Sequence, residues 1–288
     1  MKENKRKKQS QIREIWRRLK KNRPAVGGLA VFILICLVAV FGRVFIPEHL
    51  SADQVMSDRL QPPSAAHIFG TDSYGRDQFA RVIHSTRTSM TLGVGTSLFA
   101  MTIGCIVGAC SAYYGGITDT IIMRVIDIVA STPPMLLALI LVAALGSNMI
   151  NLMIAIGISS VPAFSRLARA TMLNIIDQDY IVAAKTYGTS DARLMLRHII
   201  PNAIGPIIVQ TTMSIADTIL VAAGLSYIGL GIQPPTPEWG AMLNAGREYL
   251  QTHAYLLVFP GLAIILAALS VSLLGDGLRD ALDPRLKT

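Results

Sequence analysis

Long apolar stretches constrain this chain more than any other feature of its sequence. Runs of about 20 apolar residues recur along it, and each is long enough to cross a hydrocarbon core roughly 30 Å thick. Only 15% of the residues are charged, whereas a typical soluble domain has about 25%. We therefore expect an all-α polytopic membrane protein. The apolar runs predict six transmembrane helices, at about residues 24–45, 89–112, 121–146, 149–165, 207–228 and 254–274.

Positive charge is distributed unevenly along the chain. The net charge is +8, and eleven Lys and Arg side chains lie in the first 23 residues, next to the first apolar run. A basic cluster beside a span is typical of a cytoplasmic anchor that contacts membrane lipids, and it does not indicate nucleic-acid binding. With this end inside, the interior holds about 20 Lys and Arg and the exterior about five. The positive-inside rule therefore predicts that the N- and C-termini are cytoplasmic.

These observations divide the chain into four parts. Residues 1–24 form a basic segment in which Ile12, Ile15, Trp16 and Leu19 recur at helical spacing. This pattern is typical of an amphipathic helix on the inner membrane surface, and a disordered polybasic tail is the alternative. The remaining parts are a first transmembrane helix at 25–46, an extracytoplasmic loop at 47–87, and a five-helix core at 88–288 with a cytoplasmic loop at about 166–202.

The sequence lacks the motifs of common enzyme chemistry. It contains no Gly-Lys pair, so the phosphate-binding loop of ATPases is absent, and it has neither a His-Glu-x-x-His nor a Gly-x-Ser-x-Gly motif. Its three cysteines lie inside apolar runs and have no metal-like spacing. We therefore expect no enzyme activity, no resident metal and no cofactor, and any ATP would have to bind to a separate subunit.

Residues 179–202 are the only long charged, helix-compatible stretch in the second half of the chain. Gly188 can end a first helix in the left-handed conformation, and Thr189, Ser190 and Asp191 offer side-chain oxygens to cap a second one. We expect that second helix to stop near Pro201. The small side chains of the first helix would let a partner approach closely, which predicts a docking site; an ordinary helical hairpin between two spans is the alternative.

A polar motif precedes the second span. His67, Asp72 and Asp77 could suggest metal ligands, but two glycines and an arginine among them favour a tight loop held by Asp–Arg pairing. We favour this structural role over a metal-binding or catalytic one. The motif comprises His67, Gly70, Asp72, Gly75, Arg76 and Asp77.

Several features inside the spans bear on packing and transport. Ala100, Gly104 and Gly108 recur at four-residue steps and predict a close-packing face for another helix. We expect Arg124 to pair with Asp127 near the start of the third span.

Two further positions are candidates for the lining of a transport pathway. Pro133-Pro134 must interrupt helical hydrogen bonding in mid-span, and broken backbone there is tolerated only against protein or a wet cavity. Asp217 lies deep in the fifth span and should face water, a substrate or another helix, so pathway and structural roles remain open for it.

The stretch around Gly188 resembles a loop of bacterial ATP-driven importers, written Glu-Ala-Ala, three residues, Gly, nine residues, Ile-x-Leu-Pro. Val182-Ala183-Ala184, Gly188 and His198-x-Ile200-Pro201 keep every spacing. Because Val182 replaces the acidic residue, docking here must rest on shape and apolar contact. The candidate ATPase-coupling residues are Val182, Ala183, Ala184, Lys185, Gly188, Ser190, Asp191, His198, Pro201 and Asn202.

Three other segments extend the resemblance to nearly the whole chain: residues 67–81, 225–240 and 274–286. Together the four motifs resemble the second, C-type permease subunit of the peptide/nickel family of ABC importers. The resemblance implies a type I importer permease in the bacterial cytoplasmic membrane. Its implied partners are a second homologous permease forming a heterodimer, two cytoplasmic ATPases that carry ATP and Mg, and an extracytoplasmic substrate-binding protein.

The implied cargo is a di- or oligopeptide, while nickel chelates and glutathione stay open. An ATP-independent secondary transporter or channel, with Asp217 as an ion-coupling site, is the alternative function. A structural membrane scaffold is a third possibility.

Overall fold

The computed structural model describes residues 11–282, and within this range the fold is built from helices. A single isolated antiparallel bridge joins Thr71 and Asp77. The α-helices are α1 Gln11–Leu19, α2 Arg23–Phe45, α3 Glu48–Ala52, α4 Gln78–Tyr114, α5 Gly116–Ala130, α6 Pro134–Leu145, α7 Met149–Ile176, α8 Asp179–Thr186, α9 Asp191–Leu194, α10 Ile200–Tyr227, α11 Trp239–Gly246 and α12 Tyr255–Leu282.

Five of the helical segments are long and apolar enough to cross a membrane: α2, α4, α7, α12 and the continuous stretch Asp191–Tyr227. The pair α5 and α6 completes the six expected spans if it counts as one crossing, although the two helices meet at 83°. The expected break at Pro133-Pro134 is confirmed, because α5 ends at Ala130 and α6 starts at Pro134. A proline can start a helix there, since its missing amide would have no intrahelical partner.

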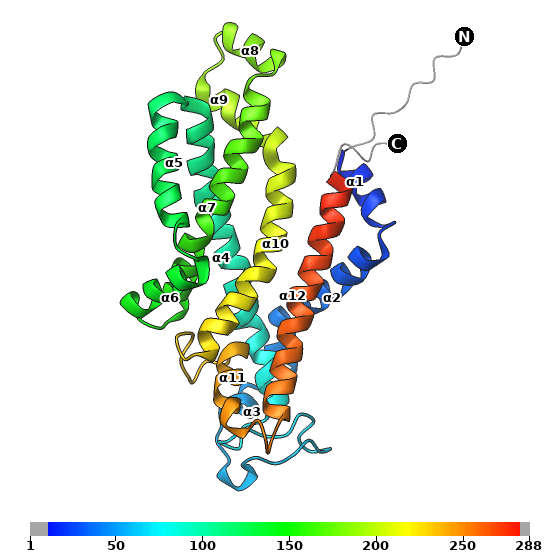
Figure 1. Ribbon diagram of the computed structural model, residues 1–288. Coiled ribbons are helices and arrows are strands. Elements are labelled where there is room, and N and C mark those ends of the chain that lie inside the picture. The colour runs from blue at the N-terminus through cyan, green and yellow to red at the C-terminus, as the bar shows by residue number, and fades with distance from the viewer. Residues whose placement is uncertain (1–10, 283–288) are drawn as a thin grey trace, which may run out of the picture.

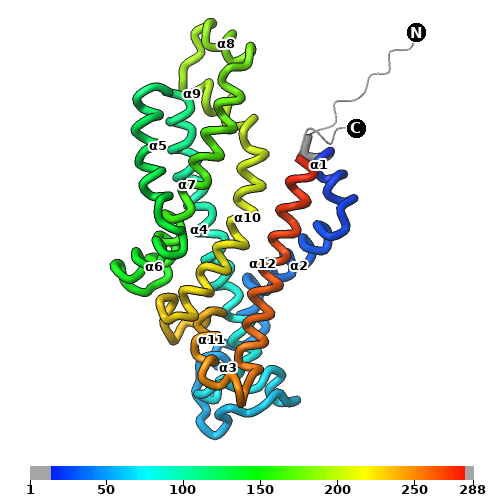
Figure 2. Tube along the Cα trace, viewed as in Figure 1, coloured from blue at the N-terminus to red at the C-terminus, as the bar shows by residue number. Residues whose placement is uncertain are grey.

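The helices form an elongated bundle (Figures 1 and 2). α4 packs along α7 and α10, and α12 packs along both α2 and α10. The α8–α9 region, α1 and the last turns of α12 lie at one end of the bundle, whereas α3 and α11 lie at the other (Figure 1). The first and last described helices thus end on the same side, as an even number of crossings requires.

The expected close-packing face on α4 is confirmed. A Cβ atom at Gly104 would lie 2.4 Å from Cβ of Phe164, and one at Gly108 would lie 2.3 Å from the carbonyl oxygen of Ser165. Ala100, one turn earlier, is fully buried. The small residues therefore allow the α4 and α7 backbones to approach closely, and α4 and α7 form the central pair of the bundle.

A loop was expected up to residue 87, but residues 78–87 are helical, because α4 begins at Gln78. The Asp77 carboxylate caps this helix by accepting a hydrogen bond from the Ala80 amide at 2.8 Å. Polar side chains in the first turns, such as Arg81 and His84, are buried by neighbouring segments. Polarity alone therefore predicted a loop where packing allows a helix.

Helix α1 contacts the rest of the protein through Leu19, which is buried and packs with Ala25 and Leu274. Trp16 on the same helix is 46% exposed, so the position of α1 on the inner membrane surface stays a prediction. A Cβ at Gly277 would lie 2.2 Å from Cβ of Ala25. The basic residues within 1–10 lie outside the described residues.

Residues 274–282 continue the last span. α12 runs without interruption to Leu282, and Asp283, Pro284 and Arg285 lie outside the described residues.

Candidate functional site

Residues 177–199 connect α7 to α10, and we refer to them as the α8–α9 segment. α8 ends at Thr186, and Gly188 has φ +75°, the left-handed conformation that ends many helices. The Thr189 amide donates to the Ala184 carbonyl at 3.2 Å, which closes the turn. The expected order of helix, glycine turn and helix is thus confirmed.

The second helix starts where expected, at Asp191 after Ser190, but the expected side-chain cap and the expected end are wrong. Ser190 is at the N-cap position but makes no side-chain capping hydrogen bond. The Asp191 carboxylate instead accepts a hydrogen bond from the Tyr113 hydroxyl at the end of α4.

The helix also does not stop near Pro201. A π-helical turn over Met195–Ile199, in which the Ile200 amide donates to the Met195 carbonyl, leads directly into α10. The wider turn shifts the hydrogen-bond register ahead of Pro201, so the proline ring is accommodated in the first turn of α10.

The α8–α9 segment has both buried and exposed apolar side chains. Ile181 and Leu194 are buried in a cluster with residues of α4, α7 and α10. On the outside, Val182 is 54% exposed, Leu196 is 70% exposed and Tyr187 is 90% exposed. Large exposed apolar side chains in a charged segment are typical of a surface that binds another protein.

The remaining predicted coupling residues lie on both sides of the glycine turn. Ala183 is exposed and Ala184 is half-buried, while the Lys185 ammonium lies 5.9 Å from the centre of the Tyr113 ring. The Asn202 amide group donates to the His198 carbonyl at 2.6 Å and lies 3.3 Å from the Tyr180 hydroxyl. These contacts tie α8 to the start of α10.

An ion pair joins the helices next to this segment. Arg169 of α7 donates two hydrogen bonds to the Asp119 carboxylate of α5, at 2.6 Å from Nε and 2.5 Å from a terminal nitrogen. The Ser111 hydroxyl of α4 donates to the same carboxylate. Three helices therefore meet at Asp119. Sequence spacing does not indicate this pair, because its members are 50 positions apart.

The expected pairing of Arg124 with Asp127 is wrong. Asp127 accepts a hydrogen bond from Arg166 of α7 at 2.8 Å. Asp119 and Asp127 are both on α5, and Arg169 and Arg166 are both on α7, so two ion pairs join these helices. One-turn spacing on a single helix suggested the wrong partner, because a better placed cation comes from the neighbouring helix.

A cavity of about 200 Å³ lies between α6, α7 and α10. It brings together Pro134 and Asp217, two residues predicted to line a pathway; Pro133 is in the bend next to it but is not part of the lining. The lining contains no basic side chain and is rich in hydroxyl groups. Its polar members are Ser159, Ser160, Gln210, Ser214, Asp217 and Thr218.

The polar motif before α4 forms a compact, self-bonded loop. The Asp72 carboxylate accepts hydrogen bonds from the Arg76 side chain at 2.7 Å and from the Tyr74 and Arg76 amides. The expected Asp–Arg pair is thus confirmed. His67 lies 3.0 Å from the Asp77 carboxylate, and a Cβ at Gly75 would lie 1.8 Å from the Val55 carbonyl oxygen. Gly70, like Gly75, has a positive φ.

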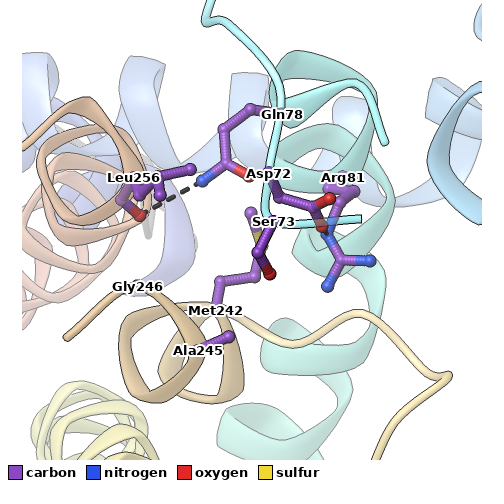
Figure 3. Close-up of a pocket in the computed structure, with 8 residues that line it drawn as sticks. All are labelled: Asp72, Ser73, Gln78, Arg81, Met242, Ala245, Gly246 and Leu256. Carbon is purple, nitrogen blue, oxygen red and sulfur yellow. Dashed lines mark hydrogen bonds and ion pairs between the residues drawn. The ribbon is translucent and has the colours of Figure 1, made fainter. Parts of the chain in front are cut away.

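Figure 3 shows how this loop contacts the rest of the protein. The Gln78 amide group donates to the Leu256 carbonyl at 3.1 Å, which ties the start of α4 to the start of α12. Arg81 lies 3.5 Å from the Asp72 carboxylate. The space between these groups is about 10 Å³, which is room for roughly one water molecule and too small for a substrate. Within residues 11–282 no cluster of His, Cys, Asp and Glu could hold a metal ion.

Two buried polar residues at this end escaped the sequence analysis. His84 lies 2.9 Å from the Ile46 carbonyl and 3.0 Å from the Ser51 hydroxyl, so it joins α4 to the end of α2 and to α3. The Glu238 carboxylate caps α11 by accepting hydrogen bonds from the Gly240 and Ala241 amides, both at 2.8 Å. The sequence signal for this cap was an acidic residue directly before an apolar helical run.

Glu238 is 2% exposed. Burial raises the pKa of its carboxyl above the usual value, while the hydrogen bonds from Gly240, Ala241 and Ser89 act in the opposite direction.

Comparisons with known proteins agree with this geometry. The family described as "Binding-protein-dependent transport system inner membrane component" matches residues 100–288, about two thirds of the chain. The chain belongs to this family. It is a permease subunit of a bacterial ABC importer and a multi-pass protein of the plasma membrane. Residues 10–63 of the permease match the "N-terminal TM domain of oligopeptide transport permease C".

Similar permeases are known from other bacteria. The chain is 41% identical to the "Dipeptide transport system permease protein DppC" of Alkalihalophilus pseudofirmus, over 96% of this chain and 90% of that protein. It is 42% identical to the "Glutathione transport system permease protein GsiD" of Pectobacterium atrosepticum, over 96% of this chain and 92% of that protein.

A solved structure of the inward-facing MetNI methionine ABC transporter covers 70% of this chain and 96% of its own, with a TM-score of 0.57 and 13% identity. At this identity the likeness shows the fold, which is that of type I importer permeases. A permease of this kind is not itself an enzyme and works within an ABC transporter complex.

Proposed function

We propose that this permease carries small peptides inward: dipeptides and oligopeptides first, with glutathione and nickel chelates as alternatives. The support is sequence similarity: the chain is 41% identical to a permease named for dipeptide transport and 42% identical to one named for glutathione transport. A secondary transporter that needs no ATP is not favoured, because the chain belongs to a family of binding-protein-dependent systems.

The α8–α9 segment is, in this proposal, the site at which an ATPase subunit docks. The observation that carries it is the exposure of three large apolar side chains, Val182, Tyr187 and Leu196, on a segment that is anchored in the bundle by Ile181 and Leu194. The first helix is narrow because Ala183 and Ala184 have small side chains, and it ends in a tight turn at Gly188. A concave partner surface can therefore enclose it. ATP and Mg are bound by two such ATPase subunits and not by the permease.

Movement of the docked segment reaches the membrane through side chains at the end of α4 and the start of α5. Tyr113 binds Asp191 of the segment. Ser111, two residues earlier on α4, binds Asp119 of α5, which is held by Arg169 of α7. α7 itself continues into α8. α4, α5 and α7 therefore receive the displacement together, and α5 carries it to the bend at Pro133.

The cavity between α6, α7 and α10 is the part of the pathway that this subunit contributes. Pro134 directly follows the 83° bend, and it lines the cavity together with Asp217. The second, homologous permease closes the other side of the pathway. The loop of His67, Asp72, Arg76 and Asp77 has a structural role: it holds the extracytoplasmic surface on which the substrate-binding protein delivers its cargo.

Reconstitution of the whole complex tests the proposal. We expect Leu196→Asp and Tyr187→Asp to lower peptide uptake per ATP hydrolysed at least about tenfold, since a desolvated charge at a protein interface costs several kcal/mol. Both side chains are exposed, so the spans should fold and insert as before. Tyr187→Phe is the matched control and should keep normal uptake. Normal coupling in both Asp variants would contradict the docking role, and uptake by the purified permease alone would contradict the importer assignment.

A further inference from the structure

A polar groove of about 480 Å³ lies between α1, the α1–α2 turn and the last turns of α12. It is at the same end of the bundle as the α8–α9 segment but on the opposite flank (Figure 1). Most of its lining is basic or polar. The lining residues are Arg17, Arg18, Lys21, Asn22, Gly277, Asp280 and Ala281.

The walls of the groove are fixed by packing and hydrogen bonds. Leu19 is buried between α1 and α12, where a Cβ at Gly277 would lie 3.1 Å from its Cδ1. Arg18 is held by the Glu14 carboxylate one turn away, at 2.7 Å. Asn22 accepts from the Ala25 amide and donates to Asp280 at 3.3 Å, which joins the start of α2 to α12.

The charged groups of the groove that are available to bind a ligand are positive. Arg17 and Lys21 are exposed at its rim, and neither forms an ion pair within the described residues. The acidic residue Asp280 accepts a hydrogen bond from Asn22. Three cationic side chains therefore surround a space lined by one carboxylate, and an anion of headgroup size fits both the charge and the volume.

The position of the groove selects the kind of anion. α2 begins at Arg23, directly after the α1–α2 turn, so the groove is at the level where a span enters the cytoplasmic leaflet. Trp16 on α1 is 46% exposed, as is common for aromatic side chains at a membrane interface. α2 and α12 pack against each other and expose apolar side chains such as Leu34 and Leu269 along their outer faces. An acyl chain can lie there while its headgroup occupies the groove.

We propose that this groove binds the phosphate-bearing headgroup of an anionic phospholipid from the cytoplasmic leaflet. Arg17 and Lys21 contact the phosphate, and Arg18 contributes a positive charge whose position is fixed by Glu14. Asn22 donates to headgroup oxygens when it is not bound to Asp280. The bound lipid contacts α1, α12 and the start of α2 and holds them together.

The test compares two double variants that remove the same charge. Arg17→Gln/Lys21→Gln removes two basic side chains that line the groove, whereas Lys20→Gln/Arg23→Gln removes two neighbours that do not. The transporter complex carrying each variant is purified in mild detergent. Binding of phosphatidylglycerol and of phosphatidylcholine is then measured by native mass spectrometry over a lipid titration.

We expect the groove variant to bind phosphatidylglycerol about 30-fold more weakly, because each basic residue near the membrane surface contributes about 1 kcal/mol. The control variant should lose less than about threefold, and phosphatidylcholine binding should not change. Equal losses in the two variants would show diffuse attraction and overturn the site. Displacement of the lipid by millimolar inorganic phosphate would overturn the lipid as the occupant.

Discussion

Gly188 shows how one residue can set the shape of the α8–α9 segment. Its φ of +75° is strained for any L side chain, yet a Cβ there would meet no atom within 4 Å. Glycine is therefore required at this position for its backbone conformation, and not because a side chain would lack space. A side chain at this position costs about 1–2 kcal/mol if the turn is kept.

We predict that Gly188→Ala lowers the uptake supported per ATP hydrolysed by about three- to tenfold, because part of the population adopts a different turn. Gly188→Val should have a larger effect, since β-branching makes the left-handed region less accessible. Gly27→Ala is the control: Gly27 is within helix α2 and its Cβ position is open. Wild-type coupling in Gly188→Val would contradict the need for the left-handed turn.

Glu238 is the buried cap of α11, and its protonation links stability to pH. We predict that Glu238→Ala lowers the free energy of unfolding by about 1–2 kcal/mol, the usual cost of losing an N-cap. Glu238→Gln should lose less, because its amide oxygen can still accept from one backbone amide. Thermal unfolding of the detergent-solubilised complex measures both.

The pH dependence of this stability has a definite sign. Because burial raises the pKa of Glu238 in the folded state, folding favours the protonated carboxyl, so its contribution is complete below the unfolded pKa. That contribution is lost as pH rises through the raised folded pKa. The melting temperature of the wild type should therefore fall with rising pH relative to that of Glu238→Gln. An unchanged difference across the acidic to neutral range would contradict this.

Local residue pairs were predictable from the sequence, whereas long-range pairs were not. The Asp72–Arg76 pair is four positions apart in a turn, so spacing alone indicated it. Asp127 also has an arginine one turn away, yet it pairs with Arg166, 39 positions further on. His84 looked like part of a loop, and only the folded chain brings Ile46 and Ser51 to its ring.

At the scale of helices, the pair Asp119–Arg169 holds α5 against α7. The contact is bidentate and is joined by Ser111 of α4, so three elements depend on one carboxylate. We predict that Asp119→Asn lowers the uptake supported per ATP hydrolysed at least about fivefold, because loss of a charge-assisted bidentate contact lets α5 move independently of α7. Assembly of the complex should be retained.

A charge swap distinguishes this role from a general packing defect. The double variant Asp119→Arg/Arg169→Asp restores one ion pair between the same helices and should recover part of the coupling, whereas Arg169→Asp alone should not. Asp127→Asn is the matched control on the same helix: its pair with Arg166 is half-exposed, and exposed pairs contribute little. Equal effects of Asp119→Asn and Asp127→Asn would contradict a special role for Asp119.

Helix boundaries were less predictable than helix existence. The apolar runs indicated the positions of the five long helical segments and of the bent pair α5 and α6, since hydropathy reports burial in lipid or protein. The start of α4 at Gln78 was missed because its polar side chains are buried against α3 and α12 and not exposed in a loop. The passage through Pro201 was missed because proline usually ends a helix, and a π-helical turn was not foreseen.

At the scale of the whole molecule, the cavity lined by Asp217 is the part of the proposed pathway between α6, α7 and α10. We predict that Asp217→Leu lowers the maximal uptake rate at least about fivefold while ATPase activity stimulated by the binding protein persists, because an apolar side chain removes the polar lining from a wet pathway. Asp217→Asn should retain more transport if polarity suffices.

The control for this prediction is on the same helix. Leu220→Ala changes a side chain that is 50% exposed and does not line the cavity, so transport should remain close to normal. A wild-type rate in Asp217→Leu would exclude Asp217 from the pathway. Loss of the complex from the membrane would instead assign Asp217 to subunit assembly.

The close fit of α4 and α7 has a consequence for where this protein can bend. With Gly104 and Gly108 against the backbone of α7, neither helix can slide or roll past the other without a collision. The two helices therefore move as one rigid unit that extends from one face of the membrane to the other. The hinges of a transport cycle must then lie outside this unit, in the turn around Gly188 and in the bend at Pro133 and Pro134.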